Sequence, residues 1–362
     1  MLHSPKYQQI LNSLAAEIRT GKYLPGQKLP SEADLVQRFG TSRITVGRSL
    51  KELKDMGLVE RVAGSGTFVR GSSRATEGLT FGLLIPNLGE TDIFEPICQG
   101  MAESGHATSH ALLWSQTNSA DPDRERQALD LCRQYIARRV TGVFFAPLEL
   151  TPDKDRVNAQ IAALLDNAGI PMVLLDRDIL PFPNRSRHDL VGIDNRRAAY
   201  MVTAHLLEQG CQRVGFVGLS GSAPTVAARI AGYRDALTAH QVPIEPALVF
   251  RFEAITAASA GRVLKQHRCD ALVCANDRIA GQMMHALLES GVRIPEDMRL
   301  AGMDDVGYAS LLPVPLTTIH QPCREIGAAA MAAMLERIQQ RGMLARDILL
   351  ACELVVRKST GL

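Results

Sequence analysis

The sequence predicts a multidomain chain: a small α+β domain of three helices and a hairpin, followed by a two-lobed α/β unit built on parallel sheets. Apolar residues keep helical spacing in three short segments before Gly57, and the ribbon RVAGSGTFV follows them. From Leu79 onward, short apolar runs alternate with longer segments of helical spacing. The length of 362 residues exceeds one ordinary domain, which agrees with this division.

The charge distribution separates the two parts. The net charge is only +2, but residues 1–75 carry 12 Lys or Arg against 6 Asp or Glu. The remaining residues carry 28 basic against 32 acidic side chains. A basic N-terminal part on a mildly acidic body favours a polyanionic partner for the N-terminal part alone.

Composition also limits the class of protein. The seven cysteines are scattered with no Cys-x-x-Cys pair, so neither a disulfide framework nor a zinc site is indicated. The N-terminus has no signal-peptide organisation, and no run of about 18 apolar residues occurs. We therefore expect a cytoplasmic protein with no membrane association, no metal site and no cofactor.

The first helix is expected after Ser4 and Pro5, which suit its cap and first position. The second helix, DLVQRF, is preceded by Ser31 with Asp34 three residues later, which is a capping-box spacing. Gly40 makes the next turn. Thr41 or Ser42 then caps a third helix, RITVGRSLKELKDM, which Gly57 closes.

Two helices joined across a tight glycine turn, the second one basic at its start, form the arrangement in which the second helix enters the major groove of DNA. The segment LVERVAGSGTFVR alternates as two strands around residues 64–66. Such a hairpin beside the recognition helix can reach a phosphate or the minor groove, because its glycines allow close approach.

These motifs resemble the winged-helix DNA-binding domain of GntR-type bacterial regulators. The family pattern is Pro-Ser-Glu, Ser-Arg-x-Thr-Val, Gly-Leu and Gly-x-Gly-Thr-Phe-Val, and residues 4–70 carry these motifs in order. The family often has Arg where this chain has Gly47, and the basic residue here is Arg48. The resemblance implies binding of double-stranded operator DNA by Lys6, Tyr7, Ser31, Glu32, Ser42, Arg43, Thr45, Arg48, Gly64, Ser65, Gly66 and Thr67.

The pattern of the remaining residues predicts a parallel α/β unit. Fully apolar runs bounded by helical segments are typical of strands buried on both faces, and the runs are LTFGLLIP, TGVFFAP, IPMVLLD, RVGFVGL, CDALVCAN and MRLAGMDD. We expect a DNA-binding domain at 1–70, a linker at 71–78 and an effector and dimerisation domain at 79–362. Its first lobe would span about 79–190 and 322–345, and its second lobe about 191–321 and 346–362.

Polar residues follow several of these runs. Asp176 and Arg177, Asn276 and Asp277, and Asp304 and Asp305 each stand at a strand end, where ligands of parallel sheets bind. Carboxylates, amides and an arginine in one cleft suit a ligand rich in hydroxyls, because a hydroxyl both donates and accepts hydrogen bonds. The alternative is that single Asp and Asn residues cap the helices that follow.

From residue 79 the chain resembles the effector domain of LacI-type repressors, itself similar to periplasmic sugar-binding proteins. The resemblance rests on ARIAGYRDAL, ALVCANDRIAGQ, MRLAGMDD and PLTTIHQPCREIG, among other segments. It implies a ligand pocket made by Phe94, Asp176, Arg177, Arg229, Asn276, Asp304 and Gln321. The pairing of both modules resembles the arabinose-responsive repressors.

An enzyme is the rival hypothesis. GLSGSA resembles a nucleophile elbow, but Ser222 stands where that motif needs glycine. His106 and His110 have a metal-binding spacing without a third ligand. The sequence therefore predicts no catalytic residue.

Together with the two resemblances, the sequence predicts a homodimeric, sequence-specific transcriptional regulator. It would be a repressor of carbohydrate-utilisation genes that a small sugar releases from DNA. A purine-type ligand, or activation in place of repression, stays open.

Overall fold

The structure is a computed structural model of the chain, and it describes residues 5–19, 22–23, 26–56, 58–62, 65–69, 78–85, 92–104, 110–114 and 123–361. The chain divides into two compact units, Met1–Leu79 and Thr80–Leu362. The division falls one residue beyond the expected start of the second domain, and most of the expected linker lies outside the described residues.

The N-terminal unit contains helices α1 (Lys6–Arg19), α2 (Glu32–Phe39) and α3 (Arg43–Asp55), and strands β1 (Val59–Val62) and β2 (Gly66–Val69). The two strands pair antiparallel, which confirms the expected hairpin. Its core includes Leu14, Leu35, Val46, Leu50 and Leu53, all buried. The apolar face of α3 therefore packs against both α1 and α2, in agreement with the predicted spacing.

The helix boundaries follow the expected caps. Ser31 and Asp34 form a complete capping box at the start of α2, and Gly40 ends this helix with φ at 56°. That left-handed conformation is one that glycine adopts without steric cost. Ser42 is the cap of α3, and its hydroxyl accepts a hydrogen bond from the Thr45 amide. The expected cap Ser4 and the expected stop Gly57 lie outside the described residues.

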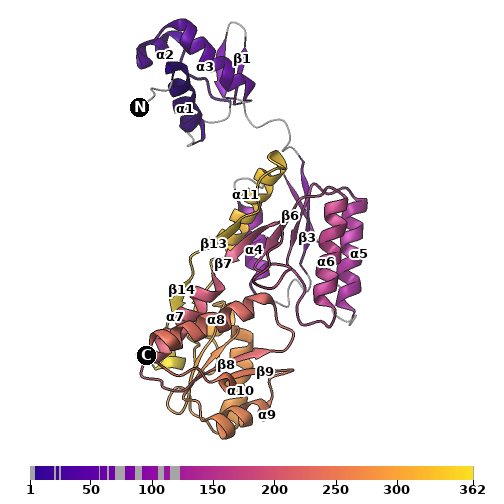
Figure 1. Ribbon diagram of the computed structural model, residues 1–362, viewed down its shortest axis with the longest axis vertical. Coiled ribbons are helices and arrows are strands. Elements are labelled where there is room, and N and C mark those ends of the chain that lie inside the picture. Colours follow the sequence, from indigo (N-terminus) through magenta and orange to yellow (C-terminus); the bar gives the residue numbers. More distant parts are fainter. Residues whose placement is uncertain are drawn as a thin grey trace. The chain divides into compact units, whose positions relative to one another are not determined.

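The first lobe of the second unit is built on a six-stranded sheet in the order β13-β7-β6-β5-β3-β4, in which every described pair is parallel. Figure 1 shows α5 and α6 along one side of this sheet and α4 and α11 on the other. Its elements are β3 (Thr80–Leu84), α4 (Phe94–Glu103), β4 (Ala111–Leu113), α5 (Arg124–Ala137), β5 (Gly142–Phe145), α6 (Lys154–Asn167), β6 (Met172–Leu175), β7 (Asp189–Ile193), α11 (Cys323–Gln339) and β13 (Asp347–Leu350).

The second lobe is built on a four-stranded parallel sheet in the order β11-β10-β8-β9. Helix α7 packs on α8, and a β-carbon at Gly232 would overlap the carbonyl oxygen of Arg196, so this contact requires glycine. The lobe consists of α7 (Asn195–Glu208), β8 (Val214–Leu219), α8 (Pro224–Ala239), β9 (Val249–Phe252), α9 (Ala257–Arg262), a π-helical turn (Val263–His267), β10 (Ala271–Cys274), α10 (Asp277–Glu289) and β11 (Arg299–Ala301).

A two-stranded antiparallel sheet of β12 (Thr318–His320) and β14 (Glu353–Val355) completes the unit, with 3-10 turns at Pro246–Leu248, Gly307–Ser310 and Lys358–Thr360. Each of the six apolar runs contains a parallel strand, which confirms the predicted architecture. The expected lobe boundaries at 191 and 346 differ from the sheets, because β7 continues to Ile193 and β13 pairs with β7 in the first lobe. Strand β13 was not predicted from the sequence, although its segment DILL carries three consecutive apolar residues.

Candidate functional site

The start of helix α3 presents polar side chains to solvent. Ser42, Arg43 and Arg48 are exposed and Thr45 is half-buried, whereas Val46 on the other face is buried. The Ser49 hydroxyl is buried and donates to the Tyr7 carbonyl oxygen at 2.9 Å. This bond fixes α3 against α1, so the exposed side chains project from a rigid support.

One carboxylate links helix α2, helix α3 and the hairpin. Glu32 accepts a hydrogen bond from Arg43 Nε at 2.9 Å and another from Arg61 Nη2 at 2.9 Å. The hydrogen bond from Arg43 is the main cause that lowers the pKa of Glu32. Glu32 therefore holds one arginine from the recognition helix and one from β1 on the same side of the domain.

Further predicted residues of this surface surround α3. The Arg48 guanidinium lies 3.9 Å from the centroid of the Tyr7 ring, which is a cation–π contact. Lys6 Nζ donates to the Gly40 carbonyl oxygen at 3.2 Å, which places the start of α1 beside the turn between α2 and α3. On the hairpin, Ser65 is exposed, and Gly66 and Thr67 are half-buried in β2. Gly64 lies outside the described residues.

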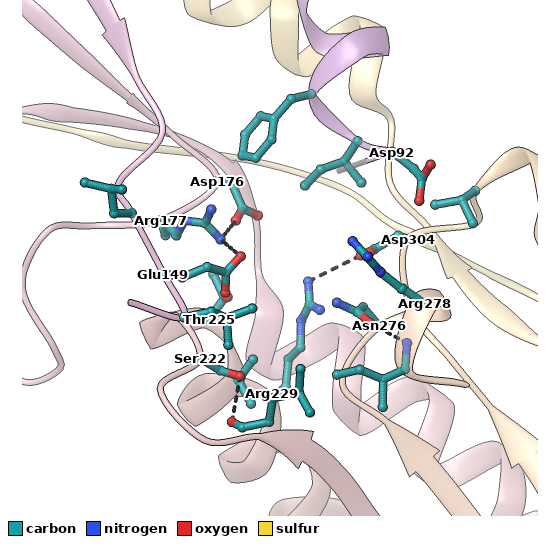
Figure 2. A pocket seen from close by; sticks show the side chains of 18 of the residues that line it. Asp92, Glu149, Asp176, Arg177, Ser222, Thr225, Arg229, Asn276, Arg278 and Asp304 are labelled. Carbon is teal, nitrogen blue, oxygen red and sulfur yellow. Dashed lines mark hydrogen bonds and ion pairs between the residues drawn. The ribbon is translucent and has the colours of Figure 1, made fainter. Parts of the chain in front are cut away.

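The second unit contains a cavity of about 380 Å³ lined by both lobes. Figure 2 shows charged side chains from both lobes converging on it. Its lining follows the carboxyl ends of β5, β6, β8, β10 and β11, as expected for parallel sheets. The predicted residues among the lining are Phe94, Asp176, Arg177, Arg229, Asn276 and Asp304.

Arg229 of helix α8 is buried and held from three sides. Its Nε donates to Asn195 Oδ1 at 2.7 Å, its Nη1 donates to the Ala275 carbonyl oxygen, and its Nη2 lies 3.6 Å from Asp304 Oδ1. Because two of its nitrogens are fixed by the second lobe, the remaining donors point toward the cavity (Figure 2). The guanidinium is therefore positioned before any ligand enters.

Asp304 faces this arginine from the end of β11. Its Oδ1 accepts a hydrogen bond from Gln321 Nε2 at 2.7 Å. Burial raises the pKa of Asp304 to about 7, with a smaller lowering by Arg229 and a further rise from Asp176. Gln321 itself is not among the residues that line the cavity. It hydrogen-bonds to Asp304 from outside the lining, and its predicted contact with a ligand stays a prediction.

Asp176 has an unsatisfied oxygen. Its Oδ1 is buried and has no hydrogen-bond partner in the described part of the chain. Burial raises its pKa, against the lowering effect of Arg177 and Arg229. A buried acceptor without a partner is unfavourable, so this atom favours a ligand that donates a hydrogen bond in the cavity.

Glu149 joins the two lobes. Its Oε1 accepts from Arg177 Nη1 at 2.7 Å, and its Oε2 accepts from the Ala223 amide of the second lobe at 3.1 Å. Ala223 is the cap position of α8 and has no side-chain cap of its own. Arg177 is further held by the Pro147 carbonyl oxygen at 2.8 Å, and its guanidinium lies 5.6 Å from the Phe94 ring centroid. Phe94 is itself buried beside the cavity.

The capping alternative holds for some strand-end residues. Asn276 is the cap of α10 and accepts from the Ile279 amide at 2.9 Å, although it also lines the cavity. Asp277 is not a lining residue, and it accepts from Thr318 Oγ1 at 2.6 Å and from the Val306 amide at 3.1 Å. Asp305 binds Arg357 and His320. Asp277 and Asp305 therefore stabilise the loops behind the cavity.

Several lining residues were not predicted from the sequence. They include Asp92, Arg124, Glu149, Ser222, Thr225, Glu253, Arg278 and Gln282. Glu149 follows the run TGVFFAP by two residues, so its place near a strand end is the signal for it in the sequence. Arg278 sits in the first turn of α10, two residues after Asn276. Nothing in the sequence marks Glu253, which follows the unpredicted strand β9.

The rival motifs show no catalytic arrangement in the described residues. Ser222 Oγ donates to the Leu219 carbonyl oxygen at 2.8 Å. His106 lies outside the described residues, so the predicted spacing with His110 has no structural account. Among the described side chains, no group of three or more His, Cys, Asp or Glu could hold a metal ion. No described helix is long and apolar enough to span a membrane.

Comparison with known proteins matches both units. Residues 6–69 match bacterial regulatory proteins of the gntR family, and residues 203–360 match the periplasmic binding protein-like domain. The chain joins a GntR-type helix-turn-helix domain to a periplasmic-binding-protein-like domain. The fold predicted from the sequence is thereby confirmed for both parts.

Relatives differ in how much of this pairing they share. The arabinose metabolism transcriptional repressor of Geobacillus stearothermophilus is 27% identical over 367 residues, covering 98% of both chains. The HTH-type transcriptional repressor PurR of Aliivibrio salmonicida is 28% identical and covers 77% of this chain and 81% of its own. A ribose-bound LacI family regulator from Enterococcus faecium, at 23% identity and a TM-score of 0.62, shares the fold over 77% of this chain and 98% of its own.

Proposed function

We propose that this protein is a transcriptional repressor that binds operator DNA through its GntR-type domain and is released by a small sugar bound between the two lobes. The supporting observation is the cavity in which the fixed donors of Arg229 face Asp304 and the unsatisfied oxygen of Asp176. This role needs no catalytic residue, cofactor or metal. A DNA-binding repressor of this kind acts in the cytoplasm.

The charges of the cavity favour an uncharged ligand with several hydroxyl groups. Its lining holds the carboxylates Asp92, Glu149, Asp176, Glu253 and Asp304 and the guanidiniums Arg124, Arg177, Arg229 and Arg278. Because neither sign is in clear excess, a charged ligand gains no general electrostatic advantage. Each hydroxyl can donate to a carboxylate and accept from a guanidinium, so this mixture suits a sugar.

Two observations favour a sugar over a purine. Phe94 is the one aromatic side chain among the described lining residues, so the cavity offers little surface for stacking a planar base. The arabinose repressor also aligns over 98% of this chain, whereas the PurR relatives align over 76% to 90% of it. A sugar-responsive regulator is therefore the better supported class.

Ligand-dependent closure of the lobes provides the mechanism. A ligand shifts the equilibrium between two states only through its differential affinity for them, so release from DNA requires tighter sugar binding in the released state. Glu149 and Ala223 make a direct contact between the lobes beside the cavity. Sugar that engages Asp176 in one lobe and Arg229 in the other would strengthen this closed arrangement.

We further propose that the protein acts as a homodimer on a pseudo-palindromic operator, since two-fold protein symmetry is matched by two half-sites. Three large apolar side chains of the first lobe are exposed and support this state: Phe182, Leu344 and Leu349. Arg185 ties the loop that carries Phe182 to Asp347 of β13 at 2.7 Å. Exposed large apolar side chains near a sheet edge are typical of a subunit interface.

The test is fluorescence anisotropy of DNA from upstream of the protein's own gene, near 150 mM salt, with and without pentoses, hexoses and purines. Tight binding that one sugar abolishes would support the proposal. Binding that a purine abolishes would show the alternative ligand class, and binding that no compound changes would contradict the ligand-gated mechanism. The position of the bound site relative to the promoter separates repression from activation.

A further inference from the structure

The most exposed large apolar side chain of the described N-terminal residues stands at the start of the recognition helix. Ile44 is the second residue of α3 and is 86% exposed. The core face of this helix is already made by Val46, Leu50 and Leu53. Ile44 therefore lies outside the core, and its contact with water is unfavourable in the free protein.

The helix surface beside Ile44 is open. Gly47 lies one turn further along the same face, and a β-carbon there would meet no described atom within 4 Å. Arg43 is held by Glu32, and Arg48 is held over the Tyr7 ring. Both neighbouring guanidiniums therefore have partners within the domain, and Ile44 is exposed beside the open position of Gly47.

We propose that Ile44 contacts the C5-methyl group of a thymine in the major groove and thereby selects a T·A pair in each half-site. This inference rests on the proposed function. The first residues of the second helix in a helix-turn-helix read base edges, and the thymine methyl is the apolar group that the major groove presents. Gly47 lets the helix backbone come close to the DNA, which a larger residue there would prevent.

The positive charges that flank Ile44 fit DNA as its partner. Arg43, Arg48 and Lys51 are all exposed on α3, and such side chains bind phosphates or base acceptors in DNA. A protein partner would meet the same positive charges, whereas DNA is the polyanion that the basic N-terminal domain favours. The isoleucine then supplies sequence selectivity that phosphate contacts lack.

The experiment uses the full-length protein and a duplex that it selects from a random library. Each thymine of the half-site is replaced by deoxyuridine in both half-sites, which removes only the methyl group. Binding is measured by anisotropy for wild type, for Ile44→Ala, and for Met56→Ala as a matched exposed apolar residue at the other end of α3. Because Ile44 is exposed, Ile44→Ala is expected to keep the thermal midpoint of wild type.

At one thymine position, wild type is expected to lose about fourfold affinity for each methyl group and roughly fifteenfold for the two half-sites together. Ile44→Ala is expected to bind the thymine duplex more weakly than wild type by about the same factor. Replacement of thymine by deoxyuridine is expected to cause no further loss of affinity in this variant. Met56→Ala is expected to match wild type on both duplexes. Such non-additivity identifies direct contact between Ile44 and the methyl group.

The inference would be overturned if wild type and Ile44→Ala lost the same affinity when thymine is replaced by deoxyuridine. It would also be overturned if the affinity of wild type did not change at any thymine position. A duplex with 5-methylcytosine opposite guanine carries the same methyl group, and tighter binding to it than to the thymine duplex would overturn the assignment to thymine. If the selection enriched no duplex, the proposed function itself would fail. Selective binding without methyl dependence would leave that function standing and remove only the role of Ile44.

Discussion

The carboxylate of Glu149 in the first lobe accepts a hydrogen bond from the Ala223 amide at the start of helix α8 in the second lobe. Its other oxygen accepts from Arg177, so one side chain connects a cavity arginine to the opposite lobe. The N-terminus of a helix carries partial positive charge and free amide donors, and a carboxylate satisfies both. This contact therefore joins the two lobes beside the cavity.

Glu149→Gln is expected to weaken sugar binding by on the order of tenfold, because hydrogen bonds to a charged group are worth about 1.5–3 kcal/mol and the amide keeps only part of them. Isothermal titration calorimetry with the identified sugar measures the loss. Asp235→Asn is the control, since Asp235 pairs with Arg196 on the surface. Unchanged affinity in Glu149→Gln would contradict a role of this contact in closure.

Asp304→Ala is expected to abolish the response to sugar while operator affinity without sugar stays at the wild-type level. The substitution removes the partner of Arg229 and of Gln321 at the cavity wall. Anisotropy titrations with and without sugar give both quantities. Asp297→Ala serves as the control, because Asp297 pairs with Arg293 away from the cavity. If Asp304→Ala were still released by the same sugar, the assignment of the pocket would be wrong.

The stability of the second unit should fall as pH rises from about 4 to about 7. The pKa of Asp304 is raised from 3.8 to about 7 by burial, so between these values the folded state holds a proton that the unfolded state has lost. Unfolding free energy then decreases with pH, by up to about 1.4 kcal/mol per pH unit for one group, and Asp304 adds no further change above pH 7.

Chemical denaturation of the sugar-free protein at several pH values measures this slope, which Asp304→Asn should reduce. Asp297→Asn should leave it unchanged, because the pKa of Asp297 is lowered to about 2 by Arg293. Burial also raises the pKa of Asp277 to about 8, so part of the slope will remain in Asp304→Asn. A slope equal to that of wild type in Asp304→Asn would contradict the raised pKa.

Arg43→Ala is expected to cost about 1–3 kcal/mol of specific binding if Arg43 reads a guanine. Binding to an unrelated duplex should weaken much less. Glu32→Gln should lower affinity too, because it releases both Arg43 and Arg61 from their shared carboxylate. Arg133→Ala, on helix α5, is the matched control for loss of one positive charge. Operator affinity unchanged in Arg43→Ala would remove Arg43 from base reading.

Leu344→Asp is expected to shift the protein toward monomers and to weaken operator binding, because a charge in an apolar interface stays unpaired on association. Analytical ultracentrifugation gives the dimer dissociation constant. Leu311→Asp is the control, since Leu311 is also strongly exposed but belongs to the second lobe. A dimer that is insensitive to Leu344→Asp would place the interface elsewhere.

The sequence by itself determined the local structure and the order of the parts. Capping residues such as Ser31 and Ser42 act within one helical turn, and buried parallel strands need continuous apolar runs, so both features can be read from neighbouring residues. Strand ends also identified Asp176, Asn276 and Asp304, because parallel strands bring their carboxyl ends to one edge.

Only the tertiary structure decided which side chains meet. It showed that Gln321 stands behind Asp304, that Asp277 accepts from Thr318 and is not a lining residue, and that Glu149 reaches the other lobe. It also assigned β13 to the first lobe. These contacts join residues far apart in the sequence, and their geometry depends on how the lobes pack. Periodicity and spacing along the chain do not predict that packing.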